Sequence, residues 1–192
     1  MREILLQRGY SVGQIGTEPS SLLFGMDYVF PMGYNSSVYI SGADTIRYLN
    51  YNMNCLCEQE NDIIIVGSQS GTITYDTGNL SQYNLSQYEF LLGTQPDAVI
   101  LCINPYDDVE HIVRTINFLE ASSECKVIAA VVFPMTIKNQ WSYMMGGKRS
   151  IELSEFEEIQ GKLSRTLNIS VYNLGDSKQI NDLVDEIIDY FV

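Results

Sequence analysis

Positive charge is scarce in this sequence. Its 192 residues hold 11 Lys and Arg against 24 Asp and Glu, which gives a formal net charge of −13 at pH 7. A surface this acidic lacks the basic footprint that contacts a phosphate backbone, so we expect no nucleic acid partner. No Lys or Arg occurs between Arg47 and Arg114. A phosphate site in that stretch would depend on backbone N–H groups, helix N-termini or basic residues from elsewhere.

Long apolar runs and an export signal are also missing. No run approaches the ~18 apolar residues that span a bilayer, and residues 1–4 do not open a basic-then-apolar signal region. The four cysteines and the single histidine are too few and too scattered for a disulfide scaffold or a zinc site. We therefore expect a cytoplasmic protein with reduced thiols and no membrane partner.

Secondary structure follows a regular alternation. Apolar runs that are typical of strands covered on both faces span residues 12–15, 62–67, 97–103, 126–133 and 168–172. Apolar residues recur at helical spacing within residues 46–56, 85–92, 109–119, 154–167 and 180–191. This order predicts a three-layer α/β fold with a mostly parallel sheet, in which residues 1–192 form a single domain.

Two helix starts are predicted from capping patterns. Asp107 has Glu110 three residues later, and Ser154 has Glu157 three residues later. Both pairs resemble the reciprocal cap in which a short polar side chain and a Glu satisfy the first free N–H groups of a helix.

The candidate ligand-binding residues lie where strands end. Two polar segments, 18–41 and 68–83, each follow a strand, and open α/β sheets bind ligands at the carboxyl edge of their strands. The small residues of segment 67–71 either turn backbone N–H groups toward a ligand or form a plain glycine-rich turn. An Asn at the end of the next strand either reads a base or a substrate amide, or belongs to a turn. The predicted ligand edge consists of Thr17, Glu18, Gln69, Ser70 and Asn104.

A phosphate-binding loop of the form G-x-x-x-x-G-K-[ST] does not occur in the sequence. The nearest match, Gly146-Gly147-Lys148-Arg149-Ser150, lacks the first glycine and has no Ser or Thr directly after the lysine. It also follows a loop instead of a strand. We interpret it as a turn.

Several segments, taken in order, resemble a known family. They are residues 9–19 with the ending Thr17-Glu18-Pro19, residues 24–34 with Pro31-Met32-Gly33-Tyr34, and residues 66–71 and 92–98. Together they resemble the C-terminal part of P-loop proteins from peptide-maturation gene cassettes, which occur beside radical-SAM enzymes and bacteriocin-like precursor peptides. The wider relatives are dethiobiotin-synthetase-like P-loop NTPases and a family that includes D-glutamate N-acetyltransferases.

The departures from these relatives are specific. In them a strand and the phosphate-binding loop precede the first helix, whereas residues 1–8 here resemble only the tail of that helix. The resemblance therefore implies a P-loop-NTPase-like (Rossmann-like) fold without its first strand and phosphate loop, the C-terminal domain of a longer protein. Synthetase-type relatives also carry a magnesium-holding Glu where this sequence has Gly67. Phosphoryl transfer needs a cradle, a lysine and a metal-holding group, so this chain should be a poor ATPase.

The resemblance implies an accessory role in peptide maturation and natural product biosynthesis. Such a protein would depend on nucleotide, with ATP and Mg²⁺ as cofactors of a full-length form, and would be weak or inactive as this chain. Its partner would be a precursor peptide or a peptide-modifying enzyme. Two alternatives stay open: a non-catalytic scaffold that docks the peptide or the enzyme, and an N-acyltransferase-like domain that acts on a small amino acid. The sequence decides neither whether it is an enzyme nor which reaction it serves.

A parallel sheet without one of its strands would expose a groove with unpaired backbone groups. Such edges template pairing with another chain, so we expect this chain to form homo-oligomers. Size-exclusion chromatography at high protein concentration checks this expectation. A sharp monomer peak would contradict it.

Overall fold

The structure, a computed structural model, describes residues 1–31, 40–68, 71–75, 78, 84–137 and 148–192. The chain divides into two compact units, Met1–Asp97 and Ala98–Val192, which are described in turn. The expectation of a single domain stays a prediction.

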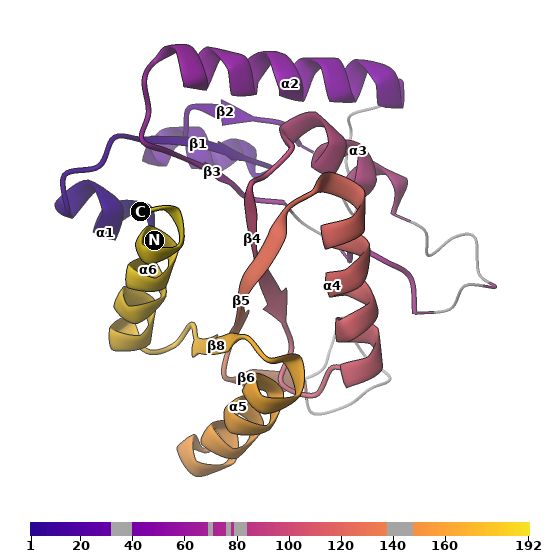
Figure 1. Cartoon of the computed structure of the whole chain (residues 1–192), viewed down its shortest axis with the longest axis vertical. Helices are drawn as coiled ribbons and strands as arrows, with labels where there is room; N and C mark the ends of the chain where they lie inside the picture. Colours follow the sequence, from indigo (N-terminus) through magenta and orange to yellow (C-terminus); the bar gives the residue numbers. More distant parts are fainter. Residues whose placement is uncertain (32–39, 69–70, 76–77, 79–83, 138–147) are drawn as a thin grey trace. The chain divides into compact units, whose positions relative to one another are not determined.

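Unit 1 is built on a parallel three-stranded sheet in the order β2-β1-β3. β1 spans Val12–Gly16, β2 spans Tyr28–Val29 and β3 spans Ile63–Val66. β1 and β3 pair in register from Val12↔Ile63 to Ile15↔Val66. The helices of this unit are α1 (Arg2–Gln7), the 3-10 helix η1 (Pro19–Phe24), α2 (Gly42–Glu58) and α3 (Leu85–Thr94) (Figure 1).

The core of unit 1 lies between its sheet and two helices. Ile15 of β1 and Phe30 pack with Leu49 and Leu56 of α2 and with Phe90 of α3. All of these side chains are buried. Because apolar residues recur along α2 at helical spacing, a single face of this helix covers the sheet.

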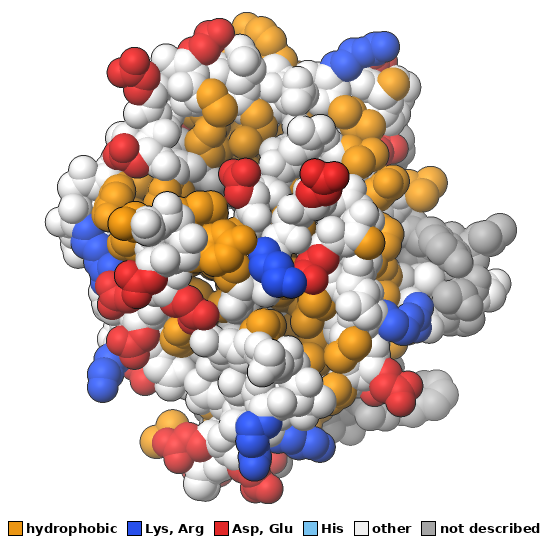
Figure 2. Space-filling model, viewed as in Figure 1, with side chains coloured by type: hydrophobic (Ala, Val, Ile, Leu, Met, Phe, Trp, Pro, Cys, Tyr) orange, Lys and Arg blue, Asp and Glu red, His pale blue; other side chains and the backbone are white. Residues whose placement is uncertain are grey.

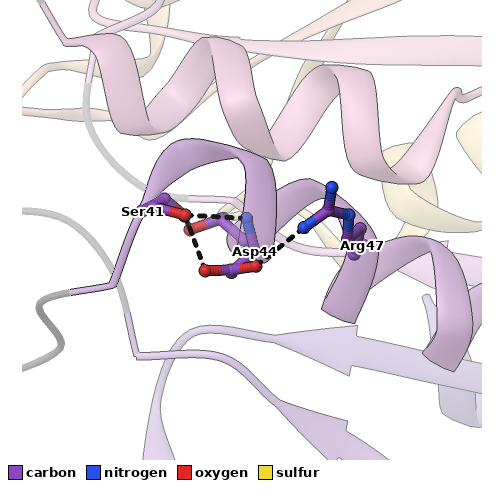
Figure 3. Close-up of polar contacts among 4 residues, drawn as sticks. Ser41, Asp44 and Arg47 are labelled. Carbon is purple, nitrogen blue, oxygen red and sulfur yellow. Dashed lines mark hydrogen bonds and ion pairs between the residues drawn. The ribbon is translucent and has the colours of Figure 1, made fainter.

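Helix α2 begins at a strong cap. The Ser41 hydroxyl accepts a hydrogen bond from the Asp44 backbone N–H and donates one to the Asp44 carboxylate. Arg47 closes the group with an ion pair to Asp44 at 3.0 Å (Figure 3). These contacts satisfy a free N–H group at the helix start and place an acid in the first turn, which also suits the helix dipole.

The amino ends of β1 and β3 are joined by side chains. The Asp62 carboxylate accepts hydrogen bonds from the Ser11 backbone N–H and from the Ser11 hydroxyl, both at 2.7 Å. These two bonds hold the pKa of Asp62 below its usual value. The Ser11–Asp62 hydrogen bonds lie directly before the first paired residues, Val12 and Ile63, and are consistent with that register.

Unit 2 contains a second parallel sheet, in the order β4-β5-β8. β4 spans Ala98–Ile103, β5 spans Lys126–Val132 and β8 spans Ser170–Asn173. β6 (Met135–Ile137) and β7 (Lys148–Ser150) form a separate antiparallel pair. The helices are α4 (Val109–Ser123), α5 (Leu153–Leu167) and α6 (Ser177–Phe191).

Helices cover both faces of the second sheet. Leu183 and Ile187 of α6 pack against Ala129 and Val131 of β5, and Figure 1 shows α4 on the opposite side of this sheet. Successive strand residues point to opposite faces, so the apolar run of β5 serves both helix layers.

The structure confirms the expected fold class, an α/β fold with parallel sheets and helices. Three details differ from the sequence-based predictions. Helix α4 is capped by Asp108 instead of Asp107. The cap position of α5 is Glu152, two residues before the predicted cap Ser154, and its side chain makes no capping hydrogen bond. Segment 18–41, which shows no period in sequence, contains η1 and β2. Within the described ranges, no helix has the length and apolar character needed to cross a membrane.

Alanine substitutions at two helical glycines should change the stability of the protein in opposite directions. A Cβ at Gly93 of α3 would lie 2.7 Å from the Leu49 Cβ, whereas a Cβ at Gly161 of α5 would meet nothing within 4 Å. Gly93→Ala should lower the free energy of unfolding by about 1–3 kcal/mol, because it forces α2 and α3 apart. Gly161→Ala should raise it by about 0.5–1 kcal/mol through helix propensity.

Urea unfolding followed by circular dichroism measures both changes. The Gly161→Ala variant serves as the matched control, since both substitutions add one methyl group to a helix. Equal effects of the two substitutions would contradict the close packing of α2 on α3.

Candidate functional site

The carboxyl ends of β1 and β3 lie side by side in unit 1. Thr17 directly follows β1 and is buried, and Glu18 is the exposed cap residue of η1. Gly67 directly follows β3 and donates its backbone N–H to the Ile15 carbonyl at 2.8 Å. Thr17, Glu18 and Gly67 therefore meet at one edge. The predicted site residues Gln69 and Ser70 lie outside the described residues.

The Gly67 hydrogen bond changes the interpretation of the glycine-rich segment. An N–H group that pairs with a neighbouring strand cannot also donate to a phosphate. The amide of Gly67 therefore belongs to the sheet and not to a phosphate cradle. Gly67 also presents no carboxylate that could hold a metal ion.

Ser68 and Gln87 form a polar contact next to this edge. The Gln87 side-chain Nε2 donates to the Ser68 hydroxyl at 2.8 Å. Gln87 lies on α3 and is only 9% exposed, and its Oε1 is buried with no hydrogen-bond partner among the described residues. A buried acceptor without a partner costs free energy. The Gln87 Oε1 is thus an acceptor at this edge that can still take a hydrogen bond from a donor.

In unit 2, Asn104 follows β4 and forms a turn. Its backbone N–H and its side-chain Nδ2 both donate to the Asp107 carboxylate, at distances of 2.8 to 3.2 Å. Asp107 is thus a turn residue, and Asp108 accepts the N–H groups of Glu110 and His111 at the start of α4. Of the two uses expected for the Asn104 side chain, the structure shows the turn.

Two residues that the sequence interpretation missed share the carboxyl edge of the second sheet with Asn104. Phe133 directly follows β5 and is 52% exposed. Asn173 ends β8, is 7% exposed, and accepts the Gly175 N–H at its Oδ1. No described residue accepts a hydrogen bond from the Asn173 Nδ2. The signal in the sequence was an aromatic and an amide residue that each end an apolar run.

A second amide fixes Asn173 in place. The Gln179 Oε1 accepts hydrogen bonds from the Asn173 backbone N–H and from the Gln160 Nε2, both at 2.8 Å. Gln160 and Gln179 come from α5 and α6. The end of β8 is therefore held by helices of its own unit, which keeps the Asn173 side chain at the edge.

The carboxyl edges of the two sheets lack clustered positive charge, so each suits an uncharged ligand group better than a phosphate. On the face drawn in Figure 2, the Lys and Arg side chains of the described residues form no broad basic patch. Nor do the described ranges bring together three His, Cys, Asp or Glu side chains that could hold a metal ion. The aromatic ring and amides of unit 2 fit a planar, hydrogen-bonding group such as a base. They do not fit a triphosphate with its magnesium.

The contact between Ser68 and Gln87 can be tested by stability. Ser68→Ala should lower the free energy of unfolding by about 1–3 kcal/mol, because it leaves the buried Gln87 Nε2 without an acceptor. Adding Gln87→Met should restore part of that loss by removing both unpaired polar atoms. Urea unfolding of the single and double variants checks this.

Ser86→Ala, an exposed position on the same helix, is the matched control and should change stability by less than about 0.5 kcal/mol. Additive losses from Ser68→Ala and Gln87→Met would contradict the contact.

Comparisons with known proteins address the whole chain. A family model described as "Domain of unknown function (DUF1611_C) P-loop domain" matches residues 1–181. No curated protein matches the chain.

Two solved structures resemble parts of the fold. The signal recognition particle 54 kDa protein from Aeropyrum pernix K1, in complex with GDP, is 11% identical with a TM-score of 0.48. That likeness covers 88% of this chain and 35% of the other, so the chain spans about a third of that protein. A nucleotide-binding protein from Archaeoglobus fulgidus, in complex with ADP, is 14% identical with a TM-score of 0.46. That likeness covers 91% of this chain and 73% of the other.

Proposed function

This chain belongs to the DUF1611_C P-loop domain family, and from this premise we propose that it is a nucleotide-dependent accessory protein of a peptide-maturation system. The peptide-maturation role comes from the sequence resemblance, and the nucleotide from the family and from the strand ends. The domain would act in the cytoplasm, and ATP with Mg²⁺ would be its cofactors in a longer form.

The observation that carries the nucleotide part is the carboxyl edge of unit 2. Asn104, Phe133 and Asn173 stand at the ends of three neighbouring parallel strands. Neighbouring strands lie about 4.8 Å apart, so the backbones of Asn104 and Asn173 lie roughly 10 Å apart, with the backbone of β5 between them. The exposed ring offers a stacking surface for a base. Asn173 is in register with Val132, so by the alternation of strand side chains its Nδ2 offers a separate donor on the other face of the sheet.

The phosphates need other groups. The sequence contains no phosphate loop, and the Gly67 N–H is used by the sheet. We propose that a phosphate loop outside residues 1–192 holds the phosphates and Mg²⁺, and that this chain binds nucleotide weakly. Thr17, Glu18, Gln69 and Ser70 stay predicted ligand residues of unit 1.

A non-catalytic scaffold is the second candidate. One observation favours it: Gly67 gives its amide to the neighbouring strand. By the sequence resemblance, this glycine also replaces the metal-holding Glu of synthetase-type relatives. In a scaffold the fold is kept to dock a precursor peptide or a modifying enzyme, and nucleotide has no role.

Calorimetric titration with ATP and Mg²⁺ tests the proposal on two proteins, the 192-residue chain and the longest in-frame product of its gene. We expect binding by the longer product and at most weak binding by the 192-residue chain. In the longer product, Phe133→Ala should weaken binding about tenfold, because base stacking contributes about 1–3 kcal/mol. Phe191→Ala, another exposed phenylalanine of unit 2, is the matched control.

Each contrary outcome has a clear meaning. Binding by neither protein, or a gene that starts at Met1 and encodes no phosphate loop, would replace the proposal with the scaffold. Tight binding by the 192-residue chain would contradict the assignment of the phosphates to another segment. CoA-dependent acylation of an amino acid would instead identify a transferase.

A further inference from the structure

Helix α2 carries a stripe of side chains that point away from the core. Tyr48, Tyr51, Cys55 and Glu58 are spaced by three or four residues, so they share one face of the helix. Tyr48 is 42% exposed and Tyr51 is 66% exposed. Large aromatic side chains exposed in a row are unusual on a surface that has no partner. This face of α2 is therefore a candidate interaction surface.

Strand β2 adds to the same surface. The rings of Phe30 and Tyr48 lie with their centroids 5.5 Å apart. The Cys55 thiol lies near enough to the hydroxyls of Tyr28 and Tyr51 to raise the pKa of both. Tyr28, which Tyr48 also influences electrostatically, belongs to the same group as Tyr48 and Tyr51 of α2, and we name these three tyrosines the tyrosine ridge.

Two tyrosine hydroxyls of the ridge, those of Tyr28 and Tyr51, have raised pKa values. Burial and the Cys55 thiol raise the pKa of Tyr28, and the hydrogen bond with Cys55 raises the pKa of Tyr51. A raised pKa keeps the Tyr28 and Tyr51 hydroxyls neutral near physiological pH. Such rings attract cations through their π faces.

Carboxylates flank the ridge. Asp27 lies near enough to Tyr28, and Glu58 near enough to Tyr51, to influence those hydroxyls electrostatically. Both carboxylates belong to exposed residues. Arg47, the nearest base along α2, is already paired with Asp44 (Figure 3). Asp27 accepts the Gln14 N–H and Glu58 accepts the Asn54 amide, but neither carboxylate has an ion pair with a described Lys or Arg. The ridge thus combines aromatic faces with negative charge.

The rest of unit 1 does not offset this charge. Residues 1–97 contain ten Asp and Glu against three Lys and Arg, a net charge of 3 − 10 = −7. A second copy of the chain would bring the same negative charge to the ridge and would be repelled. Nucleic acids and anionic membranes are disfavoured for the same reason. A cationic polypeptide is the macromolecule whose charge complements this surface.

We propose that the tyrosine ridge docks an extended peptide segment that carries arginine or lysine side chains. The cationic groups stack on the tyrosine rings and face the carboxylates of Asp27 and Glu58. Among the described strands, β2 lies at the edge of its sheet, and an edge strand can pair its backbone with an extended segment. This inference names a binding surface for the peptide partner and rests on the peptide-handling part of the proposed function.

The test uses the full 192-residue chain without nucleotide. The probe is a short fluorescein-labelled peptide in which arginine alternates with valine, and the comparison probe replaces arginine with glutamate. Fluorescence anisotropy should show saturable binding of the arginine probe that weakens with added salt, and no binding of the glutamate probe. Tyr51→Ala should weaken the binding about tenfold, the loss expected when one central aromatic contact is removed.

Matched variants separate the ridge from the general acidity of the protein. Glu58→Gln should weaken binding of the arginine probe severalfold, whereas Glu157→Gln, an exposed acid on α5, should leave it unchanged. Tyr190→Ala, an exposed tyrosine on α6, is the control for Tyr51→Ala. Circular dichroism confirms that each variant is folded.

Three results would overturn the inference. They are equal binding by the Tyr51 and Tyr190 variants, equal binding of the two probes, and a dimer in sedimentation that Tyr51→Ala dissociates. Nucleotide binding is measured separately by calorimetry and should not change in Tyr51→Ala. Failure at the ridge therefore leaves the nucleotide proposal standing, and failure of nucleotide binding leaves the ridge result readable.

Discussion

The hydrogen bond from the Gly67 amide to the Ile15 carbonyl, 2.8 Å long, determines what unit 1 can bind. It extends the pairing of β3 with β1 by one residue beyond the strand. The first N–H group of the glycine-rich segment is therefore part of the sheet. Because Gly67 also has no carboxylate, this residue gives a phosphate no donor and a metal ion no ligand. A nucleotide would have to obtain those contacts elsewhere.

Most of the regular structure was predictable because its signals are local. The apolar run of β3, Ile63–Val66, is recognisable from four residues. The apolar residues of α6 recur at helical spacing within a few turns. The cap of α4 was assigned one residue early, to Asp107 instead of Asp108. Both carboxylates suit a cap by sequence, and only the turn that joins Asp107 to Asn104 decides between them.

The candidate site was less predictable because its contacts join residues far apart in the chain. Thr17 and Glu18 could be placed at a strand end by pattern. The contact between Ser68 and Gln87 spans 19 residues, and no period in the sequence reports it. Phe133 ends an apolar run, so the sequence pattern predicts a buried strand residue, whereas the structure places it after β5 and exposes it. Gln69 and Ser70 stay predictions.

Acidity connects the two proposals. The negative charge that argues against phosphate binding by this chain also favours a cationic peptide at the tyrosine ridge. The nucleotide edge proposed in unit 2 uses an aromatic ring and amides, which need no positive charge. In this account the chain supplies the surface for the peptide and the contacts for a base, and another segment supplies the phosphate loop.

Hydrogen exchange of the Gly67 amide, followed by NMR with and without ATP and Mg²⁺, tests the central claim most directly. An amide bonded within a sheet exchanges slowly. The account predicts that Gly67 is protected in the free protein and that nucleotide leaves its exchange rate unchanged. Rapid exchange that slows when ATP and Mg²⁺ are added would contradict it, because that amide would then be a donor to the phosphates.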